Sequence, residues 1–463
     1  MESKTWIQKS WPYILAALVI ILLNVIFFAP QFQGKTVQPS DTINNMGMYN
    51  EVLTYYKKTG DESLWTNSMF SGMPTYHIFN AKDGTNFITY LTVPFLNLFG
   101  IPLAHFIMGM LAFFISFTLL GMNIWVALIG SVAFGFSTNH FLLAAAGHDT
   151  KLGTIAFFPM IAAGIFALFR NRLVLGGILF TLGLTLNIIN NHIQMSYYLM
   201  LILLPYFIIE SVYYLKKSTW LPYLKIFSIL IIGSLIAIGS SATRLWLNYD
   251  YAKDTMRGGT ILSEATANTS GGSQSSSNGL GWDYAMQWSH GTGDLIATII
   301  PSFVGGSSDE MVDPKSALMR ELRSKGANVR SLPTYWGALP FTGGPDYQGI
   351  ILMAIFLLGL FLIRGHFKWW VVFAAVFVLL QAMGKNFEIL NKFLFDYFPM
   401  YNKFRAPSSI MLTFSFIVAL FSSITLHHLI TKSYTQDQLK KAFYYSFGSL
   451  GAILLLFLLL GSG

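Results

Sequence analysis

Residues 11–29 read WPYILAALVIILLNVIFFA, and this run contains no charged side chain. A helix of this length reaches about 28 Å at 1.5 Å per residue, close to the roughly 30 Å hydrocarbon core of a bilayer. Similar runs recur along the chain of 463 residues, of which 54% are hydrophobic and only 11% charged. That composition is too apolar for an ordinary soluble enzyme. The sequence therefore predicts an all-α polytopic membrane protein.

The apolar runs predict about eleven transmembrane spans, which form one transmembrane domain over residues 1–463. The expected spans cover residues 11–29, 101–121, 123–143, 153–169, 173–189, 195–215, 223–243, 347–363, 368–384, 408–430 and 443–460. The chain has no cysteine, which excludes disulfides, thiol catalysis and cysteine metal sites.

The basic residues between the spans indicate the orientation of the chain. With a cytoplasmic N-terminus, the cytoplasmic connections carry Arg170, Arg172, Lys216, Lys217, Lys225, Arg364, Lys368, Lys432, Lys440 and Lys441. This distribution satisfies the positive-inside rule. It places three long loops, at 30–100, 244–346 and 385–407, on the exterior side, where we expect any chemistry on a polar substrate. The net charge of +8 is spread over separate loops, which argues against nucleic acid binding.

The first exterior loop begins with GKTVQPSDTINNMGMYNEVLTYYKK, residues 34–58. Apolar residues recur there at helical spacing after Asp41, which predicts a helix lying in the membrane interface. The Asp41 carboxylate has two interpretations. It caps the start of that helix, or it is a general base at the membrane surface that takes a proton from a substrate hydroxyl.

Two short exterior turns carry further polar residues. AAAGHDTKLGT, residues 144–154, places His148, Asp149 and Lys151 together, either as a solvated turn with a helix cap or as part of a site. NIINNHIQMSYY, residues 187–198, offers His192 and Gln194, which either pair with each other or line a cavity. A divalent metal at His148 and His192 is possible in principle, but no ligand spacing supports it.

Three exterior cations are candidates for binding an anion. Arg244 lies at the exterior end of its span, where it either reaches the interface or binds an anion. Lys403 and Arg405, in YNKFRAPSSIM at 401–411, precede a span on the exterior side, against the positive-inside trend. A guanidinium at headgroup depth can hold a phosphate through two parallel hydrogen bonds. We therefore interpret Arg405 as a phosphate ligand, and the alternative interpretation is an anchor in the membrane interface.

Several segments together resemble the YfhO-type bacterial membrane proteins, over nearly the whole chain. They are WTNSMFSGMPTY (65–76), AGHDTKLGTIAFFP (146–159), YAMQWSHGTGDLIATIIPSFVGG (284–306), YWGALPFTGGPDYQG (335–349) and YNKFRAPSSIM (401–411). The chain departs from the family pattern at Ala338, where an acidic residue is expected. Family members are usually longer at the C-terminus, so we expect this chain to be truncated there.

The resemblance implies a GT-C glycosyltransferase fold, with interfacial helices in long exterior loops. It also implies a polyprenyl-phosphate sugar as donor and a catalytic carboxylate in the first exterior loop, where Asp41 stands. Asp149 and His148 would orient the acceptor or bind a metal. Trp65, Tyr76, Trp282 and Trp288 are candidates for stacking on sugar rings, although interfacial aromatics are also common for other reasons.

These expectations combine into one hypothesis and two alternatives. The hypothesis is an inverting glycosyltransferase of the bacterial cytoplasmic membrane, acting at the exterior face on a cell-envelope glycan, polymer or lipid. Arg405, Lys403 and Arg244 would bind the donor phosphate, and Lys151, His192 and Gln194 would complete the substrate site. The alternatives are a transporter or flippase of lipid-linked saccharides and a non-enzymatic protein of envelope assembly. The absence of paired, broken helices in corresponding halves argues against a transporter.

Overall fold

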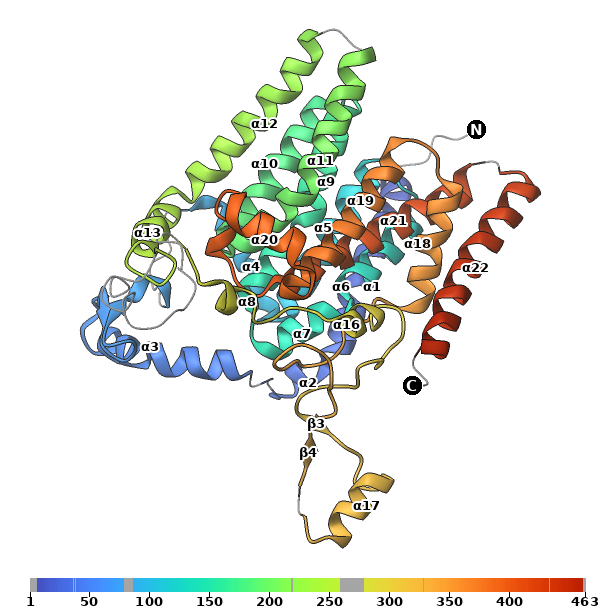
Figure 1. Cartoon of the computed structure of the whole chain (residues 1–463). Coiled ribbons are helices and arrows are strands. Elements are labelled where there is room, and N and C mark those ends of the chain that lie inside the picture. Colours follow the sequence, from blue (N-terminus) through green and yellow to red (C-terminus); the bar gives the residue numbers. More distant parts are fainter. Residues whose placement is uncertain are drawn as a thin grey trace.

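The computed structural model describes residues 6–35, 37, 39–78, 86–217, 220–258, 279–327, 329–432 and 434–460. Helices dominate (Figure 1), and the strands that are present form only two short antiparallel pairs, β1–β2 and β3–β4. The predicted all-α class is therefore confirmed. Parts of the predicted exterior loops, at 79–85 and 259–278, lie outside the described residues.

The bundle is built from helices of 7 to 25 residues, most of them apolar. They are α1 (Trp6–Phe27), α5 (Leu103–Leu119), α6 (Ile124–Gly135), α7 (Thr138–Ala146), α8 (Asp149–Ile155), α9 (Phe158–Phe169), α10 (Leu173–Ile189), α11 (Ile193–Lys217), α12 (Trp220–Ser240), α18 (Ile350–Leu362), α19 (His366–Ala382), α21 (Met411–Thr431) and α22 (Gln436–Leu460).

Shorter elements lie between them. They are α2 (Ala29–Phe32), α3 (Ser40–Thr59), β1 (Trp65–Thr66), β2 (Met73–Pro74), α4 (Val93–Phe99), α13 (Ala242–Ala252), α15 (Trp282–Ala285), α16 (Thr292–Ile296), β3 (Glu310–Met311), α17 (Ala317–Ser324), β4 (Ser331–Leu332) and α20 (Glu388–Tyr397), with 3₁₀ turns at Thr75–His77, Phe87–Leu91, Gly384–Phe387, Tyr401–Lys403 and Pro407–Ile410.

Five helical segments of the described residues are long and apolar enough to cross a membrane, or up to seven if each bent pair counts as one span. Each predicted span overlaps an apolar helix or a bent pair. However, three of them, on α5, α10 and α18, fall on helices of 10–17 residues. The membrane-protein class is thus supported, whereas the number eleven and the GT-C arrangement stay predictions.

Two predicted spans are bent. The span at 123–143 is divided into α6 and α7, which meet at 41°. The break follows Gly135, and Ser137 takes an extended conformation before α7 begins, which interrupts the helical hydrogen bonds. The span at 368–384 ends in a 119° turn from α19 into the segment Gly384–Tyr397, where Gly384 has a positive φ of 49°.

The helical segment Asp149–Phe169 is the centre of the bundle, and 94% of its apolar stretch of 18 residues is buried. It packs closely on α10 because glycines allow the two backbones to approach. A Cβ atom on Gly164 would lie 2.4 Å from the Phe180 backbone nitrogen, and one on Gly183 would lie 2.9 Å from the Ile161 nitrogen. Small residues at such crossings are typical of membrane helix pairs.

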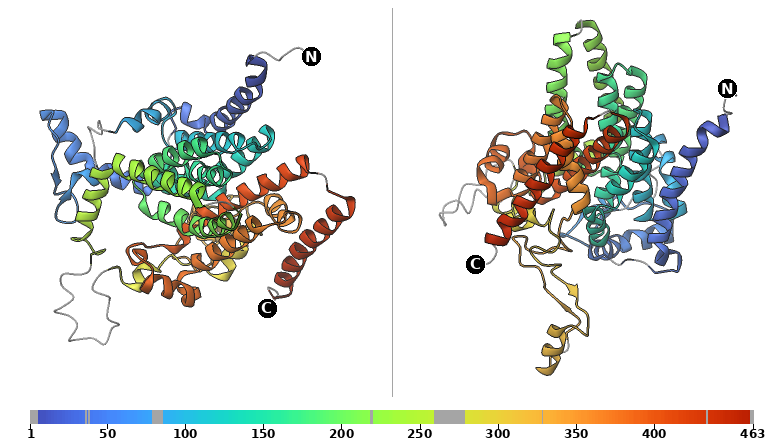
Figure 2. Two further views of the ribbon diagram at one scale, coloured as in Figure 1. Left: turned by 90° about the horizontal axis from the view of Figure 1, so that it is seen from above. Right: turned by 90° about the vertical axis from the view of Figure 1, so that its right-hand side faces the viewer.

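The predicted helix after Asp41 is α3, and it runs across one end of the bundle (Figure 1). Pro39, not Asp41, occupies the N-cap position, and the helix has no side-chain cap. Asp41 lies within the first turn, so the helix-cap interpretation of its carboxylate does not describe the structure. The cationic ends of α11 and α21 lie at the opposite end of the bundle (Figure 1), and α22 lies at its edge (Figure 2).

The close packing of α9 on α10 gives a first prediction. Gly164→Ala is expected to lower the stability of the protein by about 1–3 kcal/mol, because the added methyl group forces two backbones apart. Gly448→Ala on α22 is the matched control, since a Cβ there meets no atom within 4 Å and alanine favours a helix over glycine. Thermal unfolding of both variants in the same detergent measures the difference. Equal stability of the two variants would contradict the packing argument.

Candidate functional site

A cavity of about 550 Å³ opens at the end of the bundle that α3 crosses. It lies between the starts of α3, α8, α11 and α21 and the loops that precede α16 and α18. Six residues singled out from the sequence line it, namely Asp41, His148, Lys151, His192, Gln194 and Arg405. Trp288, a predicted stacking residue, lines it as well. The structure thus brings together side chains that lie far apart in the chain. Asp41 and Arg405, for example, are 364 positions apart.

Asp41, His148 and Lys151 form a connected row of polar groups. Asp41 Oδ2 lies 3.0 Å from His148 Nε2, and Lys151 Nζ lies 3.5 Å from His148 Nδ1. The turn between α7 and α8 makes this possible, because Gly147 adopts a left-handed φ of 80° and approaches Thr42 of α3 closely. Helix α3 is thereby held against the turn that carries the histidine.

His148 is a neutral hydrogen-bond donor at neutral pH. Burial lowers its pKa to about 4, and the positive charges of Lys151 and Arg405 act in the same direction, against the raising effect of Asp41. An ionised carboxylate only accepts hydrogen bonds, so Nε2 carries the imidazole proton and donates it to Asp41. Nδ1 is then left to accept from Lys151. The arrangement fixes one oxygen of Asp41 and leaves Oδ1 available, within the described residues, to a ligand.

Positive charge gathers on another part of the cavity wall. Arg257 and Arg405 both line the cavity. Burial lowers the pKa of the Arg257 guanidinium, and the neighbouring Arg405 lowers it further. Two cations that repel each other beside a cavity favour a bound anion, and the fork of an arginine fits a phosphate.

Arg405 is held by neutral groups. Its Nη1 donates to the Tyr284 hydroxyl at 2.6 Å, and its guanidinium lies over the rings of Tyr284 and Trp288, 5.4 and 5.7 Å from their centroids. Gln194 Nε2 donates to the Arg405 carbonyl at 2.7 Å. Ala406, with a positive φ of 57°, turns the chain into the Pro407–Ile410 turn that begins the next span.

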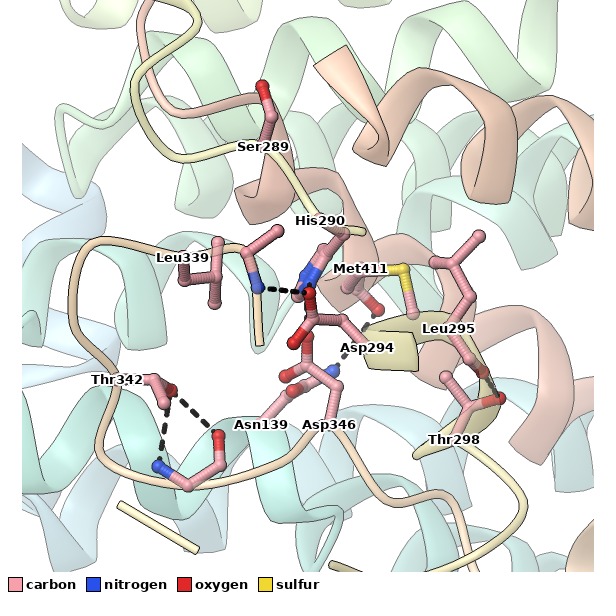
Figure 3. Close-up of polar contacts among 12 residues, drawn as sticks. Asn139, Ser289, His290, Asp294, Leu295, Thr298, Leu339, Thr342, Asp346 and Met411 are labelled. Atoms are coloured by element: carbon pink, nitrogen blue, oxygen red, sulfur yellow. Dashed lines mark hydrogen bonds and ion pairs between the residues drawn. The ribbon is translucent and has the colours of Figure 1, made fainter. Parts of the chain in front are cut away.

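A second carboxylate–histidine contact lies deeper in the wall (Figure 3). His290 is almost completely buried, and its Nε2 lies 2.9 Å from Asp346 Oδ2. Neither ring nitrogen has a hydrogen bond of good geometry within the described residues, so the two side chains are close neighbours without a hydrogen bond. Asp294, 4.0 Å from His290 Nδ1, is structural, because its two oxygens accept from the Tyr335 hydroxyl, Gly291 N and Ala338 N.

Within the described residues, none of the three cavity cations forms an ion pair with a carboxylate. The carboxylates of the cavity, Asp41 and Asp346, pair with histidines. The cations instead contact a histidine ring, a phenol or a backbone carbonyl, as in Lys151 with His148, Arg405 with Tyr284 and Arg257 with the Lys403 carbonyl. Charges of both signs are therefore left free for a substrate.

Three predicted site residues are placed elsewhere. Lys403 Nζ donates to the Arg257 carbonyl at 2.6 Å, and Arg244 Nη1 donates to the Ile189 carbonyl at 2.9 Å. Asp149 occupies the first turn of α8. None of the three is among the described residues that line the cavity. The same holds for the predicted stacking residues Trp65, Tyr76 and Trp282.

His192 lines the cavity with a buried Nδ1 that has no hydrogen-bond partner among the described residues. Burial lowers its pKa to about 3, and the charge of Lys151 adds to the effect, so the ring is neutral. As to the possible divalent metal, the described residues contain no group of three or more His, Asp or Glu side chains that could hold an ion.

Sequence reasoning did not single out three residues of the cavity wall, namely Arg257, His290 and Asp346. His290 and Asp346 lie inside two of the segments that carry the family resemblance, SHGTGD and GGPDYQG. Arg257 follows α13 in an ordinary polar stretch. Each reaches the cavity only through the folding of the long loop.

Comparison of the chain with known protein families, curated proteins and solved structures found no match. The resemblance to the YfhO-type proteins stays a prediction that depends on the motifs alone.

The contacts that His148 makes with Lys151 and Asp41 predict how its pKa responds to substitution of either neighbour. The wild-type imidazole is expected to become protonated only near pH 4, instead of near the ordinary value of about 6.5. Lys151→Met should raise this pKa by removing a repelling charge, and Asp41→Asn should lower it by removing an attracting one. Nitrogen-15 NMR of histidine-labelled protein measures the shift, with His148→Gln to assign the signal. Unchanged titration in both variants would contradict the contacts.

Proposed function

We propose that this chain is an integral membrane glycosyltransferase that uses a polyprenyl-phosphate sugar as donor. The observation that carries the proposal is the cavity at one end of an apolar bundle, in which Asp41 is oriented by His148 while Arg405, Arg257 and Lys151 have no carboxylate partner in the part of the chain that the structure describes. A lipid-linked sugar phosphate needs both kinds of group within reach of a membrane. The bacterial cytoplasmic membrane, the exterior location and the GT-C arrangement belong to the proposal.

The cations bind the donor. Its polyprenyl tail stays in the bilayer, and its phosphate lies against Arg405 and Arg257, with Lys151 on the carboxylate side of the cavity. These groups stabilise the negative charge that develops on the phosphate oxygen as the glycosidic bond breaks. A phosphate is a good leaving group, so cationic contacts replace the acid that glycoside hydrolases use.

Asp41 acts on the acceptor. Its Oδ1 removes the proton of an acceptor hydroxyl, whose oxygen attacks the anomeric carbon from the face opposite the phosphate. A new carbon–oxygen bond forms, the bond to the phosphate oxygen breaks, and the electron pair leaves with the phosphate. The configuration is inverted in one step, with no covalent enzyme intermediate. His148 keeps Oδ2 in place and is a positioning residue, because its Nε2 already carries a proton.

The cavity also suits the sugar ring. Trp288 lines it and meets Phe341, another lining residue, edge to face at 5.3 Å between ring centroids. Aromatic faces beside carboxylates favour carbohydrate over a purely apolar ligand. Contacts with other residues select the sugar and the acceptor, which is a cell-envelope glycan, polymer or lipid.

Sugar transfer by the purified protein in lipid vesicles tests the proposal. Radiolabelled polyprenyl-phosphate sugars and a cell-envelope extract supply donor and acceptor. Wild type is expected to transfer sugar. Asp41→Asn should lose about 10²–10⁴-fold in rate while it still binds donor, and Arg405→Ala should lose about 10²–10³-fold together with donor binding. Asp309→Asn, which changes an exposed acid of the loop at 244–346 that does not line the cavity, is the matched control and should behave as wild type.

Two results would contradict the proposal. Transfer by Asp41→Asn at the wild-type rate would remove Asp41 from the base role. Movement of the lipid-linked sugar across the vesicle membrane, without transfer by any variant, would favour a transporter or flippase.

A further inference from the structure

A second cavity, of about 450 Å³, lies at the opposite end of the bundle. It is bounded by the end of α18, the end of α21 and the first turns of α22, at the end where α11 also finishes (Figure 1). The charge distribution of the sequence assigns this end to the cytoplasm. The cavity is therefore remote from the site described above.

Three cations line this second cavity, namely Arg364, Lys432 and Lys441. Lys441 is paired with Asp437 at 2.9 Å. Within the described residues, neither Arg364 nor Lys432 has an ion pair or a side-chain hydrogen bond. The positive-inside rule accounts for cations on this side of the membrane, but not for their convergence on one cavity from three helix ends.

Neutral donors accompany the cations. The Tyr434 hydroxyl lies 3.1 Å from His428 Nδ1, and Gln438 accepts from Thr435 N through Oε1 at 3.0 Å. The amide NH₂ group of Gln438 is left as a donor, and both side chains line the cavity. A group with several acceptor oxygens and a negative charge matches this set, and a phosphate has both properties.

Apolar side chains form the rest of the wall. Phe361 and Tyr445 lie with their ring centroids 5.7 Å apart, and they are 46% and 61% exposed on the outside of an apolar bundle. A free inorganic anion gains nothing from such a wall, whereas a lipid places its glycerol and upper acyl chain there. Basic pockets between membrane helices on the cytoplasmic side are typical binding sites for anionic headgroups.

We propose that this cavity binds an anionic phospholipid of the cytoplasmic leaflet, with the lipid phosphate between Arg364 and Lys432. The lipid joins α22 to the bundle. Helix α22 lies at the edge (Figure 2) and contacts α18 through Ser446 Oγ, which donates to the Ala354 carbonyl at 3.2 Å. A phosphate shared by the ends of α18 and α21 and by Lys441 of α22 adds a second attachment.

Lipid binding to the full chain tests this site. Native mass spectrometry of the purified protein counts bound phosphatidylglycerol, with zwitterionic phosphatidylcholine as competitor. The Arg364→Gln, Lys432→Gln double variant is expected to bind phosphatidylglycerol about thirtyfold more weakly, given the contribution of each cation at such a surface. The Lys216→Gln, Lys217→Gln double variant removes the same charge from the same side of the protein and should bind as wild type.

A second measurement tests the site even if the Arg364→Gln, Lys432→Gln double variant does not fold. Wild-type protein should melt at a higher temperature in phosphatidylglycerol vesicles than in phosphatidylcholine vesicles, and Arg364→Lys with Lys432→Arg should retain that difference. An equal loss of phosphatidylglycerol binding in both double variants would overturn the proposal, because binding would then depend on the total charge of this side of the protein and not on the cavity. Displacement of the lipid by millimolar inorganic phosphate would overturn the assignment to a lipid and identify a free-anion site.

Discussion

The tight packing of the buried helix Asp149–Phe169 against α10 is the constraint on which the rest of the structure depends. Backbone contact at Gly164 and Gly183 leaves this helix no freedom to slide or rotate. Its first turn carries Lys151, and His148 lies one residue before it. Both side chains are therefore fixed relative to the bundle, and α3 brings Asp41 to them. A carboxylate on a surface helix gains a defined position because its partner is attached to the best-packed helix of the fold.

Sequence patterns predicted those features that depend on local chemistry. Apolar runs became helices because burial and backbone hydrogen bonding both require it, and the helical spacing after Asp41 became α3. The bends were not predicted, although the polar stretch STNH at 137–140 interrupts the apolar run of residues 123–143 close to the break. The helix-cap interpretation of Asp41 was wrong, since Pro39 occupies that position, and no propensity rule distinguishes two residues so close together.

Local chemistry predicted six lining residues of the cavity, but not how the fold brings them together. His148 and Lys151 are neighbours in the chain and remain so in the cavity. Lys403 and Arg405 are neighbours too, but the Lys403 amine donates to the Arg257 carbonyl and does not line the cavity. Arg257, His290 and Asp346 reach the wall through a long loop whose course depends on tertiary contacts, such as the hydrogen bond from Gln348 N to the Thr298 carbonyl.

The charged groups of the Asp41 cavity are held by neutral partners within the described residues. Because Asp41 and Arg405 are exposed, leaving them without an opposite charge costs little stability. The His148 imidazole holds the Asp41 carboxylate, and phenol, indole and carbonyl groups hold the cations. Such partners orient a charge without cancelling it. A ligand of mixed character can contact both kinds of group, with an anionic group for the arginines and a hydroxyl for the carboxylate. A sugar phosphate and its acceptor meet both conditions, whereas an apolar lipid or a simple anion meets only one or neither.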